Sequence, residues 1–428
     1  MGKPAVVGCS EIDVFMDQGY FVTKSGQKIG KGETITIDGT TGSVYKGEVK
    51  MVEPEPSPEL TTLLKIADGV RKLGVWANAD TPEAAAKARE FGAEGIGLCR
   101  TERMFNAANR LPIVRDMIMS RDVETRRRHL YRLFPFQLSD FKGIFSAMGG
   151  KPVVVRLLDL PLHEFLPPAE ELILDIQSMK EEKASNEEVD QVEAMLNRVR
   201  QLSEHNPMLG HRGCRLAVTY PEIYEMQTRA ILQAAIELSR EHREGARVKI
   251  MIPLVALAGE FRFLRGVVES AAEALFRDMG ARVDYQVGTM IETPRAALTA
   301  GEIAGLSDFF SFGTNDLTQT TFGFSRDDVE AKFIPKYIEM GILPQSPFDS
   351  VDVLGVGRLV KMAVLEGRGV KPTLEVGICG EHGGDPKSIR LFAEAGLNYV
   401  SCSAFRVPVA RLAAAHAALA SGTNAVTA

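Results

Sequence analysis

The sequence predicts an α/β protein in which a (β/α)8 TIM barrel follows a small β-rich N-terminal piece. From residue 74 onward, short apolar runs alternate with amphipathic helical stretches, which is the pattern of βα units on a parallel sheet. Eight such runs are present, the number that closes a barrel. Residues 1–50 are instead rich in Gly and Thr, with short β-type runs between turn signals. A length of 428 residues suits one large barrel plus a small appendage.

The eight apolar runs are the expected barrel strands. In chain order they are LGVWANAD, GIGLCRTE, KPVVVRLLDL, PMLGHRGCRL, VKIMIPLVA, YQVGTMIET, FFSFGTNDL and LEVGICGEH. The fourth run is poor in β-branched residues. Five stretches between the runs predict helices, several of them opened by Pro in the first turn: PEAAAKAREFG, PEIYEMQTRAILQAAIELSR, AGEFRFLRGVVESAAEALFRDMG, PRAALTAGEIAG and DPKSIRLFAEAG. Residues 167–204 are expected to form a long, solvated helical insert.

A linker separates the two predicted parts. The segment MVEPEPSPEL places three prolines between Pro54 and Pro58, just before a helix-prone stretch. We therefore expect a β-rich part over residues 1–52, a linker and helix over 53–73, and the barrel over 74–428.

Composition excludes several classes of protein. Charged residues make up 25% and hydrophobic residues 45%, and the formal charge of −6 gives no electrostatic footprint for nucleic acid or an anionic membrane. No apolar run approaches the roughly 20 residues of a spanning helix, and the N-terminus lacks a signal-peptide pattern. The five cysteines show no CxxC spacing, which argues against a disulfide framework and a structural zinc site. A cytoplasmic protein with reduced thiols is expected.

Polar residues that finish the apolar runs are the candidate site, because barrel enzymes act at the C-terminal ends of their strands. Three of them, Arg100, Arg156 and Arg212, would together form a planar, permanently charged clamp for a carboxylate and a phosphate. Taken singly, Arg100 and Arg156 fit salt-bridged residues at the rim better than ligands. The remaining residues of this kind are Thr101, Glu102, Asp159, His211, Arg215, Glu292, Asn315, Asp316 and Cys379.

Glu292 and Asp316 are the candidate metal ligands. They lie 24 residues apart, one βα repeat, so we expect them side by side on neighbouring strands. Two adjacent carboxylates repel unless a cation or a proton lies between them. Oxygen ligands suit Mg²⁺ or Mn²⁺ rather than zinc. A shared proton or a salt-bridged pair remains the alternative.

Cys379 lies in the segment GICGEHGG, and two interpretations of it stay open. A lone thiol after an apolar strand is a small buried hydrophobe in many proteins. The flanking glycines favour a tight loop that approaches a ligand, where nearby arginines and a metal would tune the thiol as a proton donor or nucleophile. His382 either orients this thiol or is a surface histidine. The other cysteines are assigned to packing: Cys9, Cys99, Cys214 and Cys402.

Six segments closely resemble the C-terminal phosphoenolpyruvate (PEP)/pyruvate barrel of the pyruvate phosphate dikinases, which belong to the PEP-utilising enzymes. They are GIGLCRTERMF, VVVRLLDLPLHEFLP, MLGHRGCRLAVTYPEIYEMQTRAI, GTMIETPRAAL, FFSFGTNDLTQTTFGFSRDD and ICGEHGGDPKSI. The resemblance implies a phosphotransferase that forms PEP from pyruvate through a stabilised enolate. It further implies that Arg100, Arg156 and Arg212 bind the phosphoryl group and substrate oxygens, together with Thr314, Asn315 and Asp316. Glu292 and Asp316 would hold Mg²⁺, with Mn²⁺ an alternative.

The same resemblance implies a proton-transfer role for Cys379 as general acid/base at C3 of the substrate. Ser311 and Tyr399 match positions that relay protons to that thiol, although either could be a structural hydroxyl.

The resemblance also sets expectations about partners. Residues 1–52 resemble a truncated remainder of a swivelling phosphohistidine domain without its histidine motif, and no ATP-binding domain is recognised. The full ATP-dependent cycle is therefore not expected of this chain alone: it is a fragment of a longer enzyme or is served in trans. A homodimer through the barrel is expected, with no nucleic acid or membrane partner. The alternatives are a PEP synthase- or enzyme I-like phosphotransferase, a metal-dependent pyruvate lyase, and a non-catalytic binding or dimerisation module.

Overall fold

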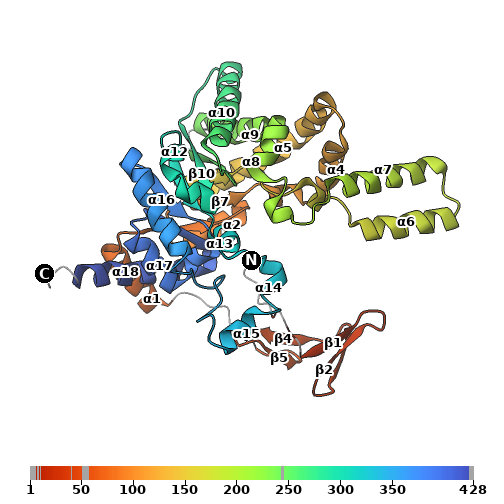
Figure 1. Ribbon diagram of the computed structural model, residues 1–428, viewed down its shortest axis with the longest axis horizontal. Coiled ribbons are helices and arrows are strands. Elements are labelled where there is room, and N and C mark those ends of the chain that lie inside the picture. The colour runs from red at the N-terminus through yellow and green to blue at the C-terminus, as the bar shows by residue number, and fades with distance from the viewer. Residues whose placement is uncertain are drawn as a thin grey trace.

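A computed structural model describes residues 6, 9, 11–39, 41–50, 57–241 and 245–423. Eight parallel strands form a closed barrel in which the last strand pairs with the first (Figure 1). In order around the barrel, the strands are β6 (Gly74–Asn78), β7 (Ile96–Arg100), β8 (Pro152–Arg156), β9 (Arg247–Ile252), β10 (Tyr285–Ile291), β11 (Phe309–Phe312), β12 (Glu375–Ile378) and β13 (Tyr399–Ser403). The predicted fold class is confirmed.

One of the eight predicted strands is wrong. The fourth run, PMLGHRGCRL, forms the short helix η2 (Pro207–Leu209) and the start of α8 (Gly213–Thr219). The eighth strand is β13, which the sequence analysis missed. A strand buried on both faces normally appears as a continuous apolar run, whereas β13 reads YVSCS and carries serines in the barrel wall. The fourth run lacked the β-branched residues that favour strands.

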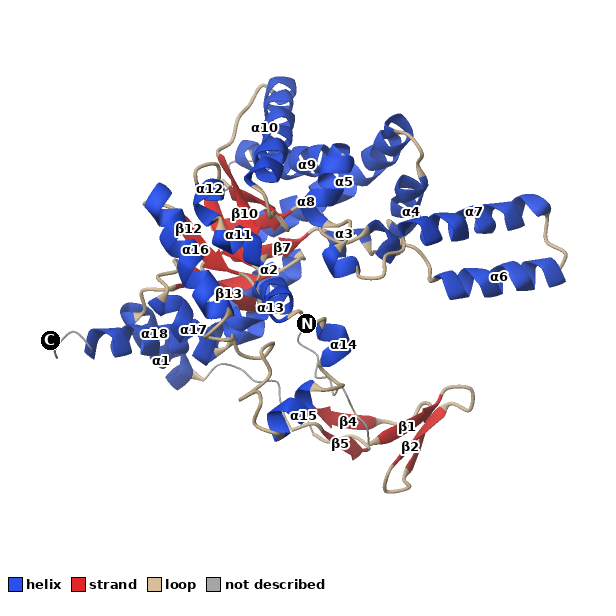
Figure 2. Cartoon of the chain, in the orientation of Figure 1, coloured by secondary structure: helices blue, strands red, loops and turns tan. Residues whose placement is uncertain are grey.

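Helices surround the barrel (Figure 2). The predicted helices are α2 (Pro82–Glu90), α9 (Pro221–Arg240), α10 (Ala258–Met279) and α17 (Pro386–Glu394), while PRAALTAGEIAG splits at Thr299 into α11 (Pro294–Leu298) and α12 (Ala300–Ala304). The others are α1 (Pro58–Val70), α3 (Glu102–Phe105), α4 (Leu111–Met119), α5 (Val123–Met148), η1 (Leu162–Phe165), α13 (Thr314–Phe322), α14 (Arg326–Val329), α15 (Ile334–Glu339), α16 (Val356–Val370), η3 (Glu381–Gly384), η4 (Ala404–Arg406) and α18 (Val407–Thr423). Thr81 and Asp385 cap α2 and α17 by accepting a backbone N–H of the first turn.

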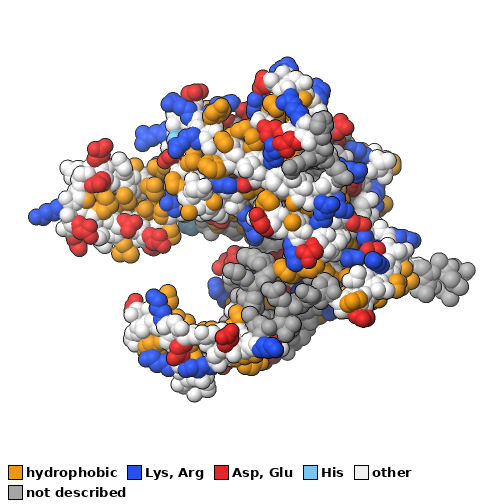
Figure 3. Space-filling view, turned by 180° about the vertical axis from the view of Figure 1, so that it is seen from behind, with side chains coloured by type: hydrophobic (Ala, Val, Ile, Leu, Met, Phe, Trp, Pro, Cys, Tyr) orange, Lys and Arg blue, Asp and Glu red, His pale blue; other side chains and the backbone are white. Residues whose placement is uncertain are grey.

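The predicted insert at 167–204 is a helical hairpin of α6 (Ala169–Glu181) and α7 (Asn186–Leu202) that projects from the barrel (Figure 1). Ser185 and Glu188 form a capping box at the start of α7. Seen from behind, the projecting arm carries acidic side chains with apolar ones between them (Figure 3). The hairpin is not solvated throughout, because Leu172 of α6 and Val189 of α7 are buried and belong to the main hydrophobic cluster.

The described residues of the N-terminal part form five short strands. β1 (Ile12–Phe15), β2 (Tyr20–Thr23) and β3 (Lys28–Gly30) form an antiparallel sheet, and β4 (Ile35–Asp38) pairs with β5 (Ser43–Lys46). Within its described residues, Ile29 is the one buried apolar side chain. The predicted boundary between residues 52 and 53 lies outside the described residues, since 51–56 are not described.

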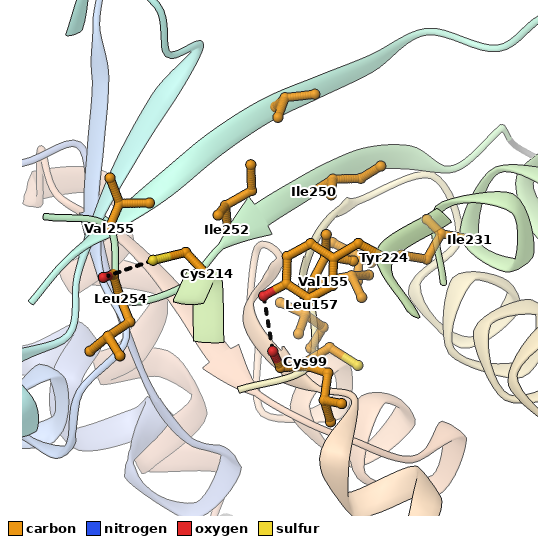
Figure 4. Close-up of a cluster of buried hydrophobic side chains, with 14 of the residues drawn as sticks. Cys99, Val155, Leu157, Cys214, Tyr224, Ile231, Ile250, Ile252, Leu254 and Val255 are labelled. Atoms are coloured by element: carbon orange, nitrogen blue, oxygen red, sulfur yellow. Dashed lines mark hydrogen bonds between the residues drawn. The ribbon is translucent and has the colours of Figure 1, made fainter. Parts of the chain in front are cut away.

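The core has two layers. Inside the barrel lie the side chains of Trp76, Leu98, Val154, Met251, Met290, Phe309, Cys379 and Tyr399. A larger cluster fills the space between strands and helices, and Figure 4 shows part of it around Tyr224. Cys99, Cys214 and Cys402 are buried there or beside it, whereas Cys9 is only partly buried. Among the helices of the described residues, none has both the length and the apolar character needed to cross a membrane.

Candidate active site

The C-terminal ends of the barrel strands surround a cleft of about 800 Å³. Most of the predicted site residues line it: Arg100, Arg156, Arg212, Glu292, Asn315, Asp316 and Cys379. Thr314 begins α13 directly beside the cleft, and Ser311 and Tyr399 lie deeper, within the strands. The geometry therefore brings together these seven candidates, whereas four others that the sequence singled out do not line the cleft: Thr101, Glu102, His211 and Arg215.

Asp159 joins two of the arginines, a role that the sequence analysis did not assign. Its Oδ2 lies 2.7 Å from Nη1 of Arg156 and 2.7 Å from Nη2 of Arg212. Arg156 also pairs with the buried Glu102, and Arg212 reaches Asp316 at 3.0 Å. Burial alone would raise the pKa of Asp159, but the two arginines lower it below its ordinary value. Both guanidiniums are thus held in place before any ligand binds.

Arg212 does not finish a barrel strand, which corrects the prediction. It is the residue before α8, within the long excursion between β8 and β9. The next residue, Gly213, has a φ of +56°, and a Cβ there would lie 2.9 Å from Oδ1 of Asp159. Glycine at this position therefore lets the loop approach Asp159 closely enough for Arg212 to pair with it.

Arg100, the last residue of β7, differs from the other two arginines. Its backbone N–H donates to Oδ1 of Asp80 at 2.6 Å, which holds the strand end in place. Its guanidinium lines the cleft and makes no ion pair with any residue that the structure describes. Arg100 is therefore the arginine of the predicted clamp that can take up an anion without first releasing a carboxylate.

Asp159, Glu292 and Asp316 offer carboxylate oxygens that lie within 4.8 Å of one another. Burial raises the pKa of Glu292 well above its ordinary value, and Asp316 and Asp159 raise it further. One oxygen of Glu292 accepts the backbone N–H of Leu254 at 2.6 Å, which directs the carboxylate into the cleft. A buried group of oxygen donors with excess negative charge fits a hard divalent cation. Glu292 and Asp316, the predicted ligands, belong to this group.

Asn315 and Asp316 lie in the first turn of α13. Nη1 of Arg326 donates to Oδ1 of Asn315 at 3.2 Å, and Nδ2 of Asn315 lies 3.5 Å from Oδ1 of Asp316. Arg326 also pairs with Glu381 across the cleft mouth. Neither Arg326 nor Glu381 was predicted as a site residue, although both lie in segments that carry the resemblance.

Cys379 follows β12 directly and is 1% exposed. Burial raises the pKa of its thiol to about 11, opposed by Ser311 and Arg156. Its backbone N–H donates to the carbonyl of Phe312 at 3.2 Å, and its own carbonyl accepts from Nδ2 of Asn78 at 3.0 Å. The thiol is thus a protonated group at neutral pH, held at the inner wall of the cleft.

The hydroxyls of Ser311 and Tyr399 are buried, and within the described residues neither has a hydrogen-bond partner of good geometry. Burial raises the pKa of both Cys379 and Tyr399, and Ser311 lies near enough to each of them to oppose this rise. The Tyr399 ring stacks on Trp76 with a centroid separation of 3.8 Å. Gly377 makes room for it, since a Cβ there would lie 2.1 Å from the tyrosine ring.

His382 is buried, 1% exposed, so the alternative of a surface histidine is wrong. The sequence offered no signal for this, because its environment comes from segments distant in the chain.

The chain matches one protein family over most of its length. The profile of a family described as "PEP-utilising enzyme, PEP-binding domain" matches residues 55–419. The chain belongs to the PEP-utilising enzymes. Its C-terminal PEP-binding domain is the barrel described above.

Several curated PEP-utilising enzymes are similar to it. The pyruvate, phosphate dikinase of Entamoeba histolytica is 53% identical over 420 residues, which is 97% of this chain and 47% of that protein. Pyruvate, phosphate dikinase 1, chloroplastic, of Arabidopsis thaliana is 52% identical over 98% of this chain and 43% of its own length. The dikinase of Rhizobium meliloti is 51% identical over 98% and 46%. The chain spans under half the length of these relatives.

A solved citrate lyase structure from Burkholderia xenovorans is much less similar. It has 14% sequence identity and a TM-score of 0.30, over 48% of this chain and 60% of that chain. That likeness is too low to bear on fold or function.

Proposed function

We propose that this PEP-binding domain carries out the PEP/pyruvate half-reaction of a pyruvate phosphate dikinase. In that reaction a phosphoryl group passes between a phosphohistidine and the enolate form of pyruvate to give PEP. The observation that carries the proposal is the meeting of an unpaired arginine, a group of carboxylates and a buried thiol in one cleft. The name shared by the similar proteins supports it.

The arginines would bind the anionic groups of the substrate. Among the residues that the structure describes, Arg100 has no carboxylate partner to release, which suits the transferring phosphoryl group. Arg156 and Arg212, whose positions are set by their ion pairs with Asp159, would bind further substrate oxygens. Thr314, Asn315 and Asp316 at the start of α13 would contact the carboxylate end of the substrate.

Glu292 and Asp316 would hold the divalent cation, Mg²⁺ with Mn²⁺ as the alternative. When bound, the cation supplies stabilisation of the negative charge that develops on the substrate oxygens. The residues that line the cleft include more carboxylates than arginines. A divalent cation at Glu292 and Asp316 would offset part of this negative charge, which favours the binding of an anionic substrate.

Cys379 would transfer the proton at C3. In the direction of pyruvate the S–H bond breaks, the proton goes to C3, and a thiolate remains; in the direction of PEP the thiolate takes a methyl proton and becomes a thiol. A thiol with a pKa raised to about 11 suits the donating step at neutral pH. Ser311 and Tyr399, with no other partners among the described residues, would connect the thiol to further proton carriers.

The partners follow from the same proposal. The phosphohistidine and the ATP-binding domain would lie outside the barrel, in a longer protein or on a separate chain. We keep the division into 1–52, 53–73 and 74–428, with residues 1–52 as part of a swivelling domain. A homodimer through the barrel is a further part of the proposal, which sedimentation equilibrium checks. A cytoplasmic location stays a prediction, and some plant relatives are named chloroplastic.

The test is the exchange of pyruvate methyl protons in D₂O, followed by NMR with and without Mg²⁺. Wild-type protein should exchange them in a metal-dependent manner, and Cys379→Ala should lose this exchange while still binding oxalate with Mg²⁺. Exchange by Cys379→Ala at the wild-type rate would overturn the role of the thiol. Ser311→Ala and Tyr399→Phe should slow exchange without loss of stability, because a buried hydroxyl without a partner contributes no net stabilisation.

A further inference from the structure

His382 makes two hydrogen bonds that define its protonation state. Its Nε2 lies 2.9 Å from the carbonyl oxygen of Pro347, and its Nδ1 lies 2.8 Å from Oγ1 of Thr314. A carbonyl oxygen only accepts, so Nε2 must carry the hydrogen. In the neutral ring Nδ1 then has a lone pair and accepts the hydrogen of the Thr314 hydroxyl. The contacts therefore select one tautomer of a neutral imidazole.

These two bonds connect three segments around the cleft. His382 lies in η3, three residues after Cys379, whereas Thr314 begins the helix that carries Asn315 and Asp316. The two loops pack tightly, since a Cβ on Gly380 would lie 2.2 Å from Oγ1 of Thr314. His382 thus links the loop that follows Cys379 to the first residue of α13, the helix that carries Asp316.

Pro347 provides a fixed end for this chain of hydrogen bonds. The segment that follows it is held to the start of α17. The hydroxyl of Ser350 donates to Oδ2 of Asp385 at 2.7 Å, and the backbone N–H of Val351 donates to Oγ of Ser388 at 3.0 Å. With both its nitrogens bound, the His382 ring has one orientation, and Thr314 is held relative to it.

We propose that His382 is a positioning residue that sets, through Thr314, the distance between the thiol of Cys379 and the substrate held beside Asp316. This inference rests on the proposed function, in which Cys379 moves a proton at C3. A displacement of about 1 Å at a reacting centre can reduce a rate about a hundredfold. Such a displacement should affect substrate binding less, because Asp316 is also held by hydrogen bonds from Arg212 and Gln319.

The charges around His382 agree with a neutral ring. Burial lowers the pKa of His382, and Arg326 lowers it too, while the bond to Pro347 and the acidic groups Glu381 and Asp385 raise it; the net shift is downward. Protonation would put a hydrogen on Nδ1 and reverse the bond to Thr314. The arrangement is therefore present at neutral pH and is lost as the pH falls below the ordinary range of histidine.

Two substitutions separate the two bonds. In His382→Asn, Oδ1 takes the approximate place of Nδ1 and can accept from Thr314; in His382→Gln, Nε2 can donate to Pro347 but nothing accepts from Thr314. With Mg²⁺ and pyruvate in D₂O, His382→Gln should exchange methyl protons about ten- to hundredfold more slowly than wild type, and His382→Asn should lose less. The Kd for oxalate with Mg²⁺ should change less than about threefold in both. The exposed His416 on α18 gives the matched control, His416→Gln.

Thr314 variants complete the cycle. Thr314→Ser, which keeps the hydroxyl, should exchange faster than Thr314→Val. The double variant Thr314→Val/His382→Gln should exchange no more slowly than the slower single variant, because both substitutions remove the same hydrogen bond between Thr314 and His382. Wild-type exchange in His382→Gln, or equal losses of exchange and oxalate affinity, would overturn the positioning role.

A spectroscopic test does not depend on catalysis. Histidine labelled with ¹⁵N reports the tautomer of each of the seven histidines, and His382→Gln assigns the relevant signals. A neutral ring with its hydrogen on Nε2 is expected at neutral pH. The other tautomer, or a charged ring at neutral pH, would overturn the inference. Absence of exchange in the wild type alongside the expected tautomer would instead count against the proposed function alone.

Discussion

At the scale of single residues, the site is a set of arginines and carboxylates, some of which are already paired with one another. Asp159 pairs with Arg156 and Arg212, while Glu292 lies beside Asp316 and forms no ion pair among the described residues. The arginines lower the pKa of Asp159, whereas burial and neighbouring carboxylates raise that of Glu292. The pKa values of two neighbouring carboxyl groups in one cleft are thus shifted in opposite directions, downward for Asp159 and upward for Glu292.

The raised pKa of Glu292 predicts that Mg²⁺ binding depends on pH. A proton on this carboxyl competes with the cation, and it leaves only above the ordinary glutamate range. The affinity for Mg²⁺ should therefore increase with pH, by up to about tenfold per unit while Glu292 remains protonated. Calorimetric titration between pH 5 and 8 measures this, with Glu292→Gln as the variant that lacks the dependence. Equal affinity across this range in the wild type would contradict the prediction.

Arg100 and Arg156 should respond differently to the same substitution. Arg156→Met leaves Glu102 without its buried partner, so we expect the free energy of unfolding to fall by about 3–5 kcal/mol. Arg100→Met breaks no ion pair among the described residues, so stability should hold while PEP binding weakens by about ten- to hundredfold. Urea denaturation and calorimetric binding separate the two effects. Arg282→Met, at an exposed ion pair with Glu273, is the control that should leave both unchanged. A stability loss in Arg100→Met as large as that in Arg156→Met would show that Arg100 has a structural role.

At the scale of elements, glycines in two strands shape the interior of the barrel. A Cβ on Gly97 of β7 would lie 2.4 Å from Cβ of Ser401 in β13. On Gly377 of β12 it would lie 2.1 Å from the ring of Tyr399. The ring of Tyr399 stacks on Trp76, so a shift of this ring would also disturb that contact. The two glycines therefore leave the room that the side chains of Ser401 and Tyr399 occupy, and Tyr399 shares its buried cluster with Cys379.

Gly377→Ala should destabilise the protein by about 1–3 kcal/mol through overpacking. It should also slow methyl-proton exchange, since the Tyr399 ring has to shift. Gly369→Ala is the matched control, because Gly369 lies in α16 with nothing within 4 Å of the added methyl. That substitution should stabilise the helix by about 0.5–1 kcal/mol. Thermal and urea unfolding of both variants measure the difference, and a Gly377→Ala protein as stable as wild type would refute the steric argument.

At the scale of the whole molecule, the barrel and the N-terminal strands differ in how they are held. Helix α1 packs on α18, and Asp68 of α1 pairs with Arg411 of α18. Arg71, which follows α1, pairs with Glu94 at 2.7 Å. The strands β1–β5 pair only with one another among the described residues. Helix α1 is therefore attached to the barrel by packing and ion pairs. Among the described residues, the strands β1–β5 do not pair with the barrel strands.

Two truncations test this difference. Removal of residues 1–56 should leave the thermal unfolding of the barrel unchanged, because Ile29 is the one buried apolar residue that the described part of this segment contributes. Removal of residues 1–72 should lower the unfolding temperature by several degrees, since it also deletes α1 and its ion pairs. Differential scanning calorimetry measures both, and equal losses in the two truncations would contradict the proposed boundary.

Much of the site could be predicted from the sequence because four of its residues lie at or directly after the ends of strands. Arg100, Arg156, Glu292 and Cys379 finish apolar runs that became β7, β8, β10 and β12. The carboxyl ends of parallel strands meet at one end of a barrel, so a local pattern is enough to bring such residues together. The resemblance to PEP-utilising enzymes rested on the same segments, and the family match supports it.

The sequence by itself therefore determined the fold class and the residues at the strand ends. Only the tertiary structure decided that β13 closes the barrel, that Arg212 arrives from an excursion, that Asp159 pairs with two arginines and that His382 is buried between two loops. The physical reason is the range of the interactions. Periodicity reports which face of an element is buried, whereas Asp159 and Arg212 lie 53 residues apart and Thr314 and His382 lie 68 apart, so their contacts depend on how distant segments pack.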